Sequence, residues 1–302
     1  MSRQATVLKP LFLAAALTCA LSATLSAHAA DWSDTSISYR YIAKESAFVT
    51  DANGNKVDVA KQIVSLTHID GYKYGTNFFN IDVLKSDSNN PANGSSVTSP
   101  AGAEEVFAIY RHDLSLSAVS GVSLKKGIVK DVTLTAGFNL GAKNDYNAAA
   151  PMALLLGPTV QFVLPTGFLN VGLQAYKENN NSAYANTNGQ GSHQQFKTAA
   201  QLNAVWGIPF NAVVVPANFK GFLSVTGPKG RGTANGDETR TETLMDALVM
   251  FDVGSLSGKK DVFLAGIGYR YWNNKFGNDE ALNANNKAGH ISAPFVQVEA
   301  HF

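Results

Sequence analysis

The chain has 302 residues, with 24 lysines and arginines against 23 aspartates and glutamates, so its formal net charge is +1. Such a nearly neutral chain argues against nucleic acid or an anionic membrane surface as the main partner. No run of about 18 apolar residues follows Ala30, so no transmembrane helix is expected.

The first 30 residues have the pattern of a secretory signal peptide. Arg3 and Lys9 precede an apolar run, and small residues up to Ala30 form an A-x-A cleavage site. Cleavage there removes Cys19, the only cysteine, and leaves no disulfide framework. Lipidation of Cys19 is the alternative, but Thr18 stands where a lipoprotein has Gly or Ala. We therefore expect a signal peptide at 1–30 and one domain at 31–302.

Alternating apolar and polar residues recur along the whole mature chain, separated by clusters of Gly, Asn, Pro and Asp. This pattern predicts about twelve strands. Their expected ranges are 34–41, 61–69, 76–85, 104–116, 128–140, 152–164, 168–178, 194–206, 213–226, 239–253, 261–272 and 291–302. The last strand alternates up to Phe302, the final residue, as expected of a closing strand that the barrel-assembly machinery recognises.

The lengths of the connections also alternate. Long polar segments are expected at 43–60, 86–103, 141–151, 179–192, 227–238 and 273–290. Short ones are expected at 70–75, 117–127, 165–167, 207–212 and 254–260. Long loops on one rim and short turns on the other are typical of bacterial outer-membrane barrels. The sequence thus predicts an all-β, transmembrane, antiparallel up-and-down β-barrel in the Gram-negative outer membrane, with both termini periplasmic.

Charged residues set which face of each strand points into the lumen, because a Lys or Arg in mid-membrane lipid costs roughly 2 to 4 kcal/mol. The candidate lumen residues are Phe78, Asn80, Asp82, Glu105, Phe107, Arg111, Tyr176, Arg240, Glu242 and Arg270. Aromatic rings stack on flat rings, while the amide and charged groups hydrogen-bond hydroxyls. This mixture suits a flat ring joined to a sugar. The alternative is that these side chains only fill and rigidify a small barrel.

Several stretches carry a more specific resemblance. They are DWSDTSISYRY, VSLTHIDGYKYGTNFFNIDVLKSD, EEVFAIYRHDLSLSAVSG, NGDETRTETL and GYRYWNNKFG. Over most of the mature sequence the chain resembles the Tsx-type nucleoside-specific channel-forming outer-membrane proteins. The resemblance implies a monomeric twelve-stranded barrel that passes nucleosides and deoxynucleosides without a cofactor.

Residue by residue, Arg111, Arg240 and Arg270 match recurrent arginines of that family. Phe78 and Asn80 stand where it has an aromatic and a polar lumen residue. The loops NNNSAYANTNGQGSH and NANNKAGH depart from the family pattern, which leaves a general or other small-solute porin as the alternative.

Other motifs are weaker. His68 and the pair His112 and Asp113 are candidates for an outer-membrane hydrolase, but no nucleophile motif accompanies them, so no enzyme is expected. DANGNKVD resembles the start of a calcium loop, but Lys56 replaces its glycine, so no metal is expected. The glycine-rich loop with Lys229 and Arg231 is expected to contact lipopolysaccharide at most.

Overall fold

The computed structural model describes residues 30–45, 53, 55–90, 101–144, 150–181, 193–212, 214–231, 238–279 and 289–302. The predicted signal peptide, apart from Ala30, and Cys19 lie outside the described residues. So do parts of the predicted long loops, including most of NNNSAYANTNGQGSH.

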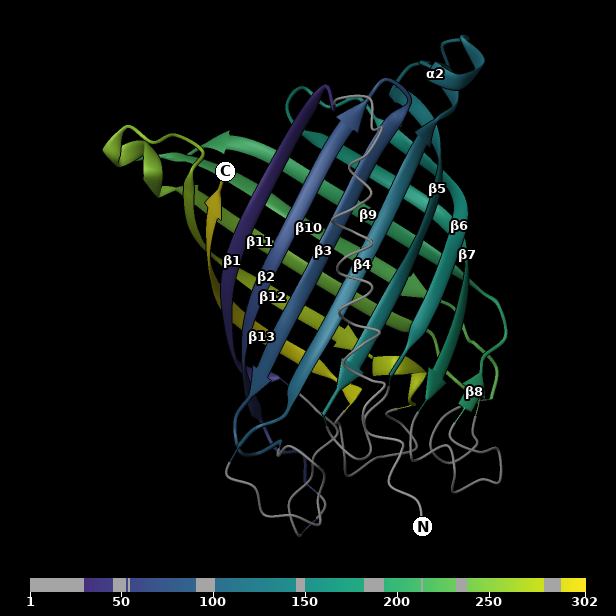
Figure 1. Ribbon diagram of the computed structural model, residues 1–302, viewed down its shortest axis with the longest axis vertical. Coiled ribbons are helices and arrows are strands. Elements are labelled where there is room, and N and C mark those ends of the chain that lie inside the picture. The colour runs from purple at the N-terminus through teal and green to yellow at the C-terminus, as the bar shows by residue number, and fades with distance from the viewer. Residues whose placement is uncertain are drawn as a thin grey trace, which may run out of the picture.

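Thirteen strands of the described part form one antiparallel sheet that closes on itself (Figure 1). They are β1 (Trp32–Glu45), β2 (Val59–Tyr72), β3 (Gly75–Ser86), β4 (Glu104–Ser115), β5 (Val129–Lys143), β6 (Met152–Phe162), β7 (Phe168–Asn181), β8 (His193–Gln195), β9 (Ala199–Asn211), β10 (Pro216–Thr226), β11 (Glu242–Asp252), β12 (Phe263–Asn273) and β13 (Ile291–His301). β8 and β9 both pair with β7 and share one place in the wall. The structure is therefore a closed twelve-stranded barrel, as predicted.

Barrel closure joins the two ends of the chain. β1 pairs with β13, with Ser36 opposite His301, and β6 pairs with β7. The predicted pairing of the last strand with the first is confirmed. Connections of two to thirteen residues lie at the rim where β1 begins and β13 ends, and connections of eight to seventeen residues lie at the opposite rim (Figure 1). We call these the short-turn rim and the long-loop rim.

Many strand ends differ from the predictions by one to five residues, and one predicted strand is interrupted. The strand expected at 194–206 is interrupted after Gln195, because Phe196 N–H bonds to β7 while Lys197 N–H donates to Lys229 O in the loop after β10. β11 begins at Glu242, since Thr239 and Arg240 donate their N–H groups to loop carbonyls instead of the sheet. β10 begins at Pro216 rather than 213.

Short helical segments occupy two connections and one long loop. α2 (Leu116–Ser120) begins where Ser115 Oγ accepts from Ala118 N–H and ends at Gly121, whose φ of +72° suits glycine. The 3₁₀ segments are η2 (Val253–Ser257) and η3 (Lys275–Gly277). Among the described residues, no helix is long and apolar enough to cross a membrane.

The barrel is apolar outside and polar inside. Apolar residues such as Val64, Leu154 and Ile267 are exposed on the outer face, whereas polar residues such as Gln174 and Asp246 are buried on the inner face. Residues directly opposite each other in neighbouring strands share a face of the sheet. The strand register therefore keeps apolar residues outside and polar residues inside around the whole barrel. This is the reverse of a soluble protein, and it fits an outer surface in contact with lipid. The inward faces predicted for β3, β4, β11 and β12 from their charges agree with this register.

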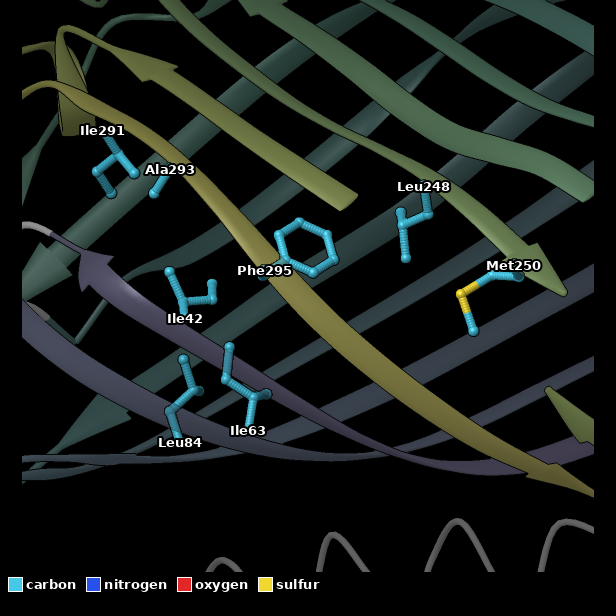
Figure 2. Packing of buried hydrophobic residues seen from close by; sticks show 8 residues of the cluster. All are labelled: Ile42, Ile63, Leu84, Leu248, Met250, Ile291, Ala293 and Phe295. Carbon is cyan, nitrogen blue, oxygen red and sulfur yellow. The ribbon is translucent and has the colours of Figure 1, made fainter. Parts of the chain in front are cut away.

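An apolar cluster fills part of the lumen, which sequence patterning did not predict. It consists of Ile42, Ile63, Leu84, Leu248, Met250, Ile291, Ala293 and Phe295, as Figure 2 shows. Phe295 faces Gly268 across the β12–β13 pair, and a Cβ at Gly268 would lie 2.3 Å from the ring. The glycine thus makes room for the largest ring of the cluster. Packing of this kind narrows the barrel on the side of β1, β2 and β13.

Candidate functional site in the barrel lumen

An ionic network lines the lumen where the first and last strands meet. Asp246 on β11 accepts two hydrogen bonds from Arg270, at 2.8 and 2.7 Å, and one from Arg40 of β1 at 2.6 Å. Arg270 also reaches Glu45 at 3.2 Å, and Glu45 lies 3.2 Å from Lys61. Asp246, Glu45 and Lys61 are each almost completely buried. Since every charge has a partner, this network offers no free group to a solute, and loss of any one member would leave a buried charge uncompensated.

Two loops at the long-loop rim each send a lysine into the barrel. Lys229 lies 2.7 Å from Glu178 and above the ring of Phe196. Lys275 of η3 lies 3.4 Å from Glu45 and above the ring of Trp272. Both lysines are buried. Lys229 lies in a loop as expected, but its ammonium pairs with the buried carboxylate of Glu178 and faces the barrel interior. The contact of this loop with lipopolysaccharide stays a prediction.

On the opposite side of the barrel the lumen is lined by a belt of hydroxyl and amide groups. In order around the wall, the belt consists of Asp113, Thr135, Thr159, Gln174, Asn203 and Ser224. Thr135 and Thr159 share a hydrogen bond of 2.6 Å, and Gln174 Nε2 donates to Thr159 at 3.0 Å. Apart from Asp113, the residues of this belt carry no charge, so the belt is a neutral polar surface.

Between these two regions, β3 and β4 form an accessible part of the lumen. Their inward positions from 76 to 82 and from 105 to 115 are all half-buried, as are those of β10 from 218 to 224, whereas most of those of β6, β7 and β13 are buried. Within the described part of the chain, Asp82, Arg111 and Asp113 form no ion pair, unlike the charges of the ionic network. We call these two strand faces the β3–β4 wall.

Arg111 is held in place without a carboxylate. One Nη donates to the backbone oxygens of Tyr110 and Phe138, at 2.7 and 2.9 Å, and the other donates to Asn139 at 2.7 Å. Gly137 lies opposite, and a Cβ there would be 2.8 Å from Arg111 Cδ. The guanidinium is thereby oriented while its positive charge stays available to an incoming group.

The structure brings six of the ten predicted lumen residues together on the β3–β4 wall. Phe78 faces Arg111, and Asp82 faces Phe107, across the strand pair. Asn80 donates to Asp82 at 2.7 Å. The sixth, Glu105, has an inward position as predicted, but it accepts from Lys61 at 2.6 Å and belongs to the ionic network.

The other four predicted residues lie elsewhere. Tyr176 is buried on β7 and donates to Glu178 at 3.1 Å. Glu242 accepts from Trp272 Nε1, and Arg270 is saturated by Asp246 and Glu45. Arg240 was expected to point inward from a strand, but it precedes β11, has a side chain 60% exposed and pairs with Asp279 at the long-loop rim.

Sequence reasoning missed Arg40, although a signal for it exists. In β1, Ser36, Ser38 and Arg40 share one parity, opposite Ile37 and Tyr39. Lys229 and Lys275 had no such signal, because residues in loops follow no period that predicts where they point.

The histidines considered for hydrolysis lie on the outward face near the short-turn rim. His68 Nδ1 is 2.7 Å from Thr35 Oγ1, but His68 Nε2 is 3.5 Å from Asp70, beyond the reach of a base and its orienting carboxylate. His112 hydrogen-bonds to Asn77 at 3.0 Å. Among the described residues, no three His, Cys, Asp or Glu side chains are grouped as a metal site.

No protein-family model and no curated protein matches the chain. Solved structures of several outer-membrane barrels do, among them the following three. The translocator domain of the autotransporter NalP from Neisseria meningitidis is 11% identical with a TM-score of 0.44, and the match covers 97% of this chain and 96% of that one. The NanC porin is 9% identical with a TM-score of 0.43, covering 90% and 99%. The outer membrane protein OpdK from Pseudomonas aeruginosa is 10% identical with a TM-score of 0.30, covering 90% and 99%. At these scores the matches carry no argument about function, and membership of the nucleoside-channel family stays a prediction.

Proposed function

We propose that the protein is an outer-membrane channel for passive diffusion of small solutes, and that its solutes are nucleosides and deoxynucleosides. The observation that carries the proposal is the β3–β4 wall, where two aromatic rings, an amide and unpaired charges face an accessible part of the lumen. The resemblance of the sequence to Tsx-type channels supports the same solute class.

The chemistry of the wall suits a nucleoside. Phe78 offers a π face to a base, a contact worth about 1 to 3 kcal/mol per base. Phe107 packs against the apolar cluster and offers the part of its ring that stays accessible. Asn80, Asp82 and Arg111 offer acceptors and donors to sugar hydroxyls and ring nitrogens. Several weak sites in series favour conduction, because a solute must enter easily and also leave quickly.

The packing around the wall supports selectivity. The apolar cluster and the ionic network fill the lumen on the side of β1, β2 and β13. A solute is thereby confined to the β3–β4 wall and the neutral belt beside it. The alternative is a general small-solute porin, in which the same side chains only shape the opening.

The decisive measurement is ion current through the purified barrel in a planar lipid bilayer. We expect adenosine or thymidine to reduce the current in a saturable way, and equimolar ribose to have little effect. If the protein conducts ions but nucleosides at millimolar concentration do not block the current, nucleosides are refuted as the solutes and the general porin remains. Failure of the folded protein to conduct ions at all would refute the channel.

A matched pair of variants on β3 tests the wall itself. Phe78 points into the lumen and Phe79, the next residue, points outward. Phe78→Ala is expected to weaken nucleoside block about tenfold if one stacking contact is lost, whereas Phe79→Ala leaves it unchanged. Equal effects of the two changes would show that Phe78 acts through barrel stability instead of contact with the solute.

A further inference from the structure

The short-turn rim has an unusual distribution of charge. Its five connections and the first residues of β5 carry six exposed lysines: Lys73, Lys125, Lys126, Lys130, Lys259 and Lys260. Among the described residues of these connections, Asp261 is the only exposed acid, and it lies 3.9 Å from Lys260. Asp31, directly before β1, is a second exposed acid at this rim. Since the whole chain is close to neutral, the excess of positive charge is a local property of this rim.

Exposed apolar side chains accompany these lysines. In the connection that contains α2, Val119, Val122 and Ile128 are 56%, 62% and 70% exposed, and α2 projects beyond the barrel wall (Figure 1). In the connection that contains η2, Leu256 is 68% exposed. Both connections thus combine apolar residues with a pair of adjacent lysines. Apolar groups beside lysines suit the boundary between hydrocarbon and headgroups, where ammonium groups reach the phosphates.

Beside the second of these connections lies a shallow apolar groove in the outer face of the barrel, running over β1, β12 and β13. The groove is lined mainly by Ile37, Tyr39, Val64, Val253, Phe263 and Val298. Lys260 is three residues before Phe263, so the two Cα atoms are at most about 11 Å apart. The groove therefore has cationic groups near its end at the short-turn rim.

We propose that the short-turn rim binds anionic phospholipid, and that the groove beside Phe263 holds an acyl chain of a lipid whose phosphate lies at Lys259 and Lys260. A hydrocarbon chain matches the apolar lining, and a negatively charged headgroup matches the lysine pair. Lys125 and Lys126 next to α2 hold further headgroups of the same leaflet. This inference rests on the barrel's place in a membrane and is independent of the solute that it conducts.

The test uses the mature protein refolded in phosphatidylcholine bilayers that contain spin-labelled phosphatidylglycerol or spin-labelled phosphatidylcholine. Electron paramagnetic resonance gives the relative association constant of the two lipids at the protein surface. We expect a preference for phosphatidylglycerol of about threefold or more in the unaltered protein. The combined change Lys125→Gln, Lys126→Gln, Lys259→Gln and Lys260→Gln should bring it close to one.

Two further variants distinguish binding at the short-turn rim and in the groove from a general effect of the protein's positive charge. Lys44→Gln with Lys85→Gln removes two exposed lysines at the other rim and should leave the preference unchanged. Ala265→Trp fills the groove without altering charge and should lower the immobilised phosphatidylglycerol. An unchanged preference in the four-lysine variant, or an equal loss in the Lys44 and Lys85 control, would overturn the proposal. Circular dichroism confirms that each variant is folded, and nucleoside block measured in parallel reports separately on the solute.

Discussion

Asp246 joins three strands of the barrel through a single carboxylate, which makes it the most informative position to perturb. Its side chain is 2% exposed and accepts from Arg40 and twice from Arg270. Asp246→Asn keeps the shape but removes the negative charge, so two buried guanidinium groups face an amide. Breaking a buried ion pair from one side costs about 3 to 5 kcal/mol. Arg270 retains Glu45 at 3.2 Å and Arg40 retains Gln297 at 2.6 Å. We therefore expect Asp246→Asn to lower the free energy of unfolding by about 3 kcal/mol, the lower end of this range.

The assay is urea unfolding of the refolded barrel, followed by tryptophan fluorescence. Lys85→Gln serves as the control, since it breaks an ion pair with Glu104 in which both side chains are exposed, and it should change the free energy of unfolding by less than about 1 kcal/mol. The double change Asp246→Leu and Arg270→Met removes both members of the Asp246–Arg270 pair, leaves Arg40 with Gln297, and should recover part of the lost free energy of unfolding. If Asp246→Asn costs no more than Lys85→Gln, the account of the ionic network is refuted.

Three other changes have defined outcomes. Gly268→Ala places a Cβ 2.3 Å from the Phe295 ring and should lower the free energy of unfolding by about 1 to 3 kcal/mol through overpacking; an unchanged urea midpoint would contradict this. Burial lowers the pKa of Lys275 to about 8 despite the attraction of Glu45, so the unfolded chain binds this proton more tightly than the folded one. The free energy of unfolding should therefore rise as pH increases from about 8 to 10.5. Unfolding measured across this pH range should lose the rise in Lys275→Met. Arg111→Gln removes a lumen cation that forms no ion pair. The reversal potential measured across a salt gradient should shift toward cation selectivity. An unchanged reversal potential would show that ions do not pass the β3–β4 wall.

Strand pairing was largely predictable because a membrane barrel separates apolar and polar residues with a period of two. In β3 and β4 the alternation of charges was enough to place Phe78, Asp82, Phe107 and Arg111 on the inward face, and the pairing of the two strands then brings them together. Strand ends were less predictable. The ladder stops at Glu242 and breaks after Gln195 because loop carbonyls compete for the backbone N–H groups.

Membership of the candidate site was only partly predictable. Arg270 and Glu105 point inward as expected, yet ion pairs occupy both, while Arg111 on the same inner surface has none. Alternation predicts the side of the sheet and says nothing of which neighbours satisfy a charge, because partners such as Glu45 and Lys61 come from strands far away in the sequence.

The sequence by itself determined the barrel, its number of strands and the inward face of the strands that carry charges, since these follow from the local cost of placing polar groups in lipid. Only the tertiary structure decided that Phe295 and its neighbours fill part of the lumen, that Lys229 and Lys275 turn into the barrel, and that the β3–β4 wall keeps its charges unpaired. These properties depend on contacts across the lumen, which arise only when the wall closes and sets the distances between strands that the chain itself keeps apart.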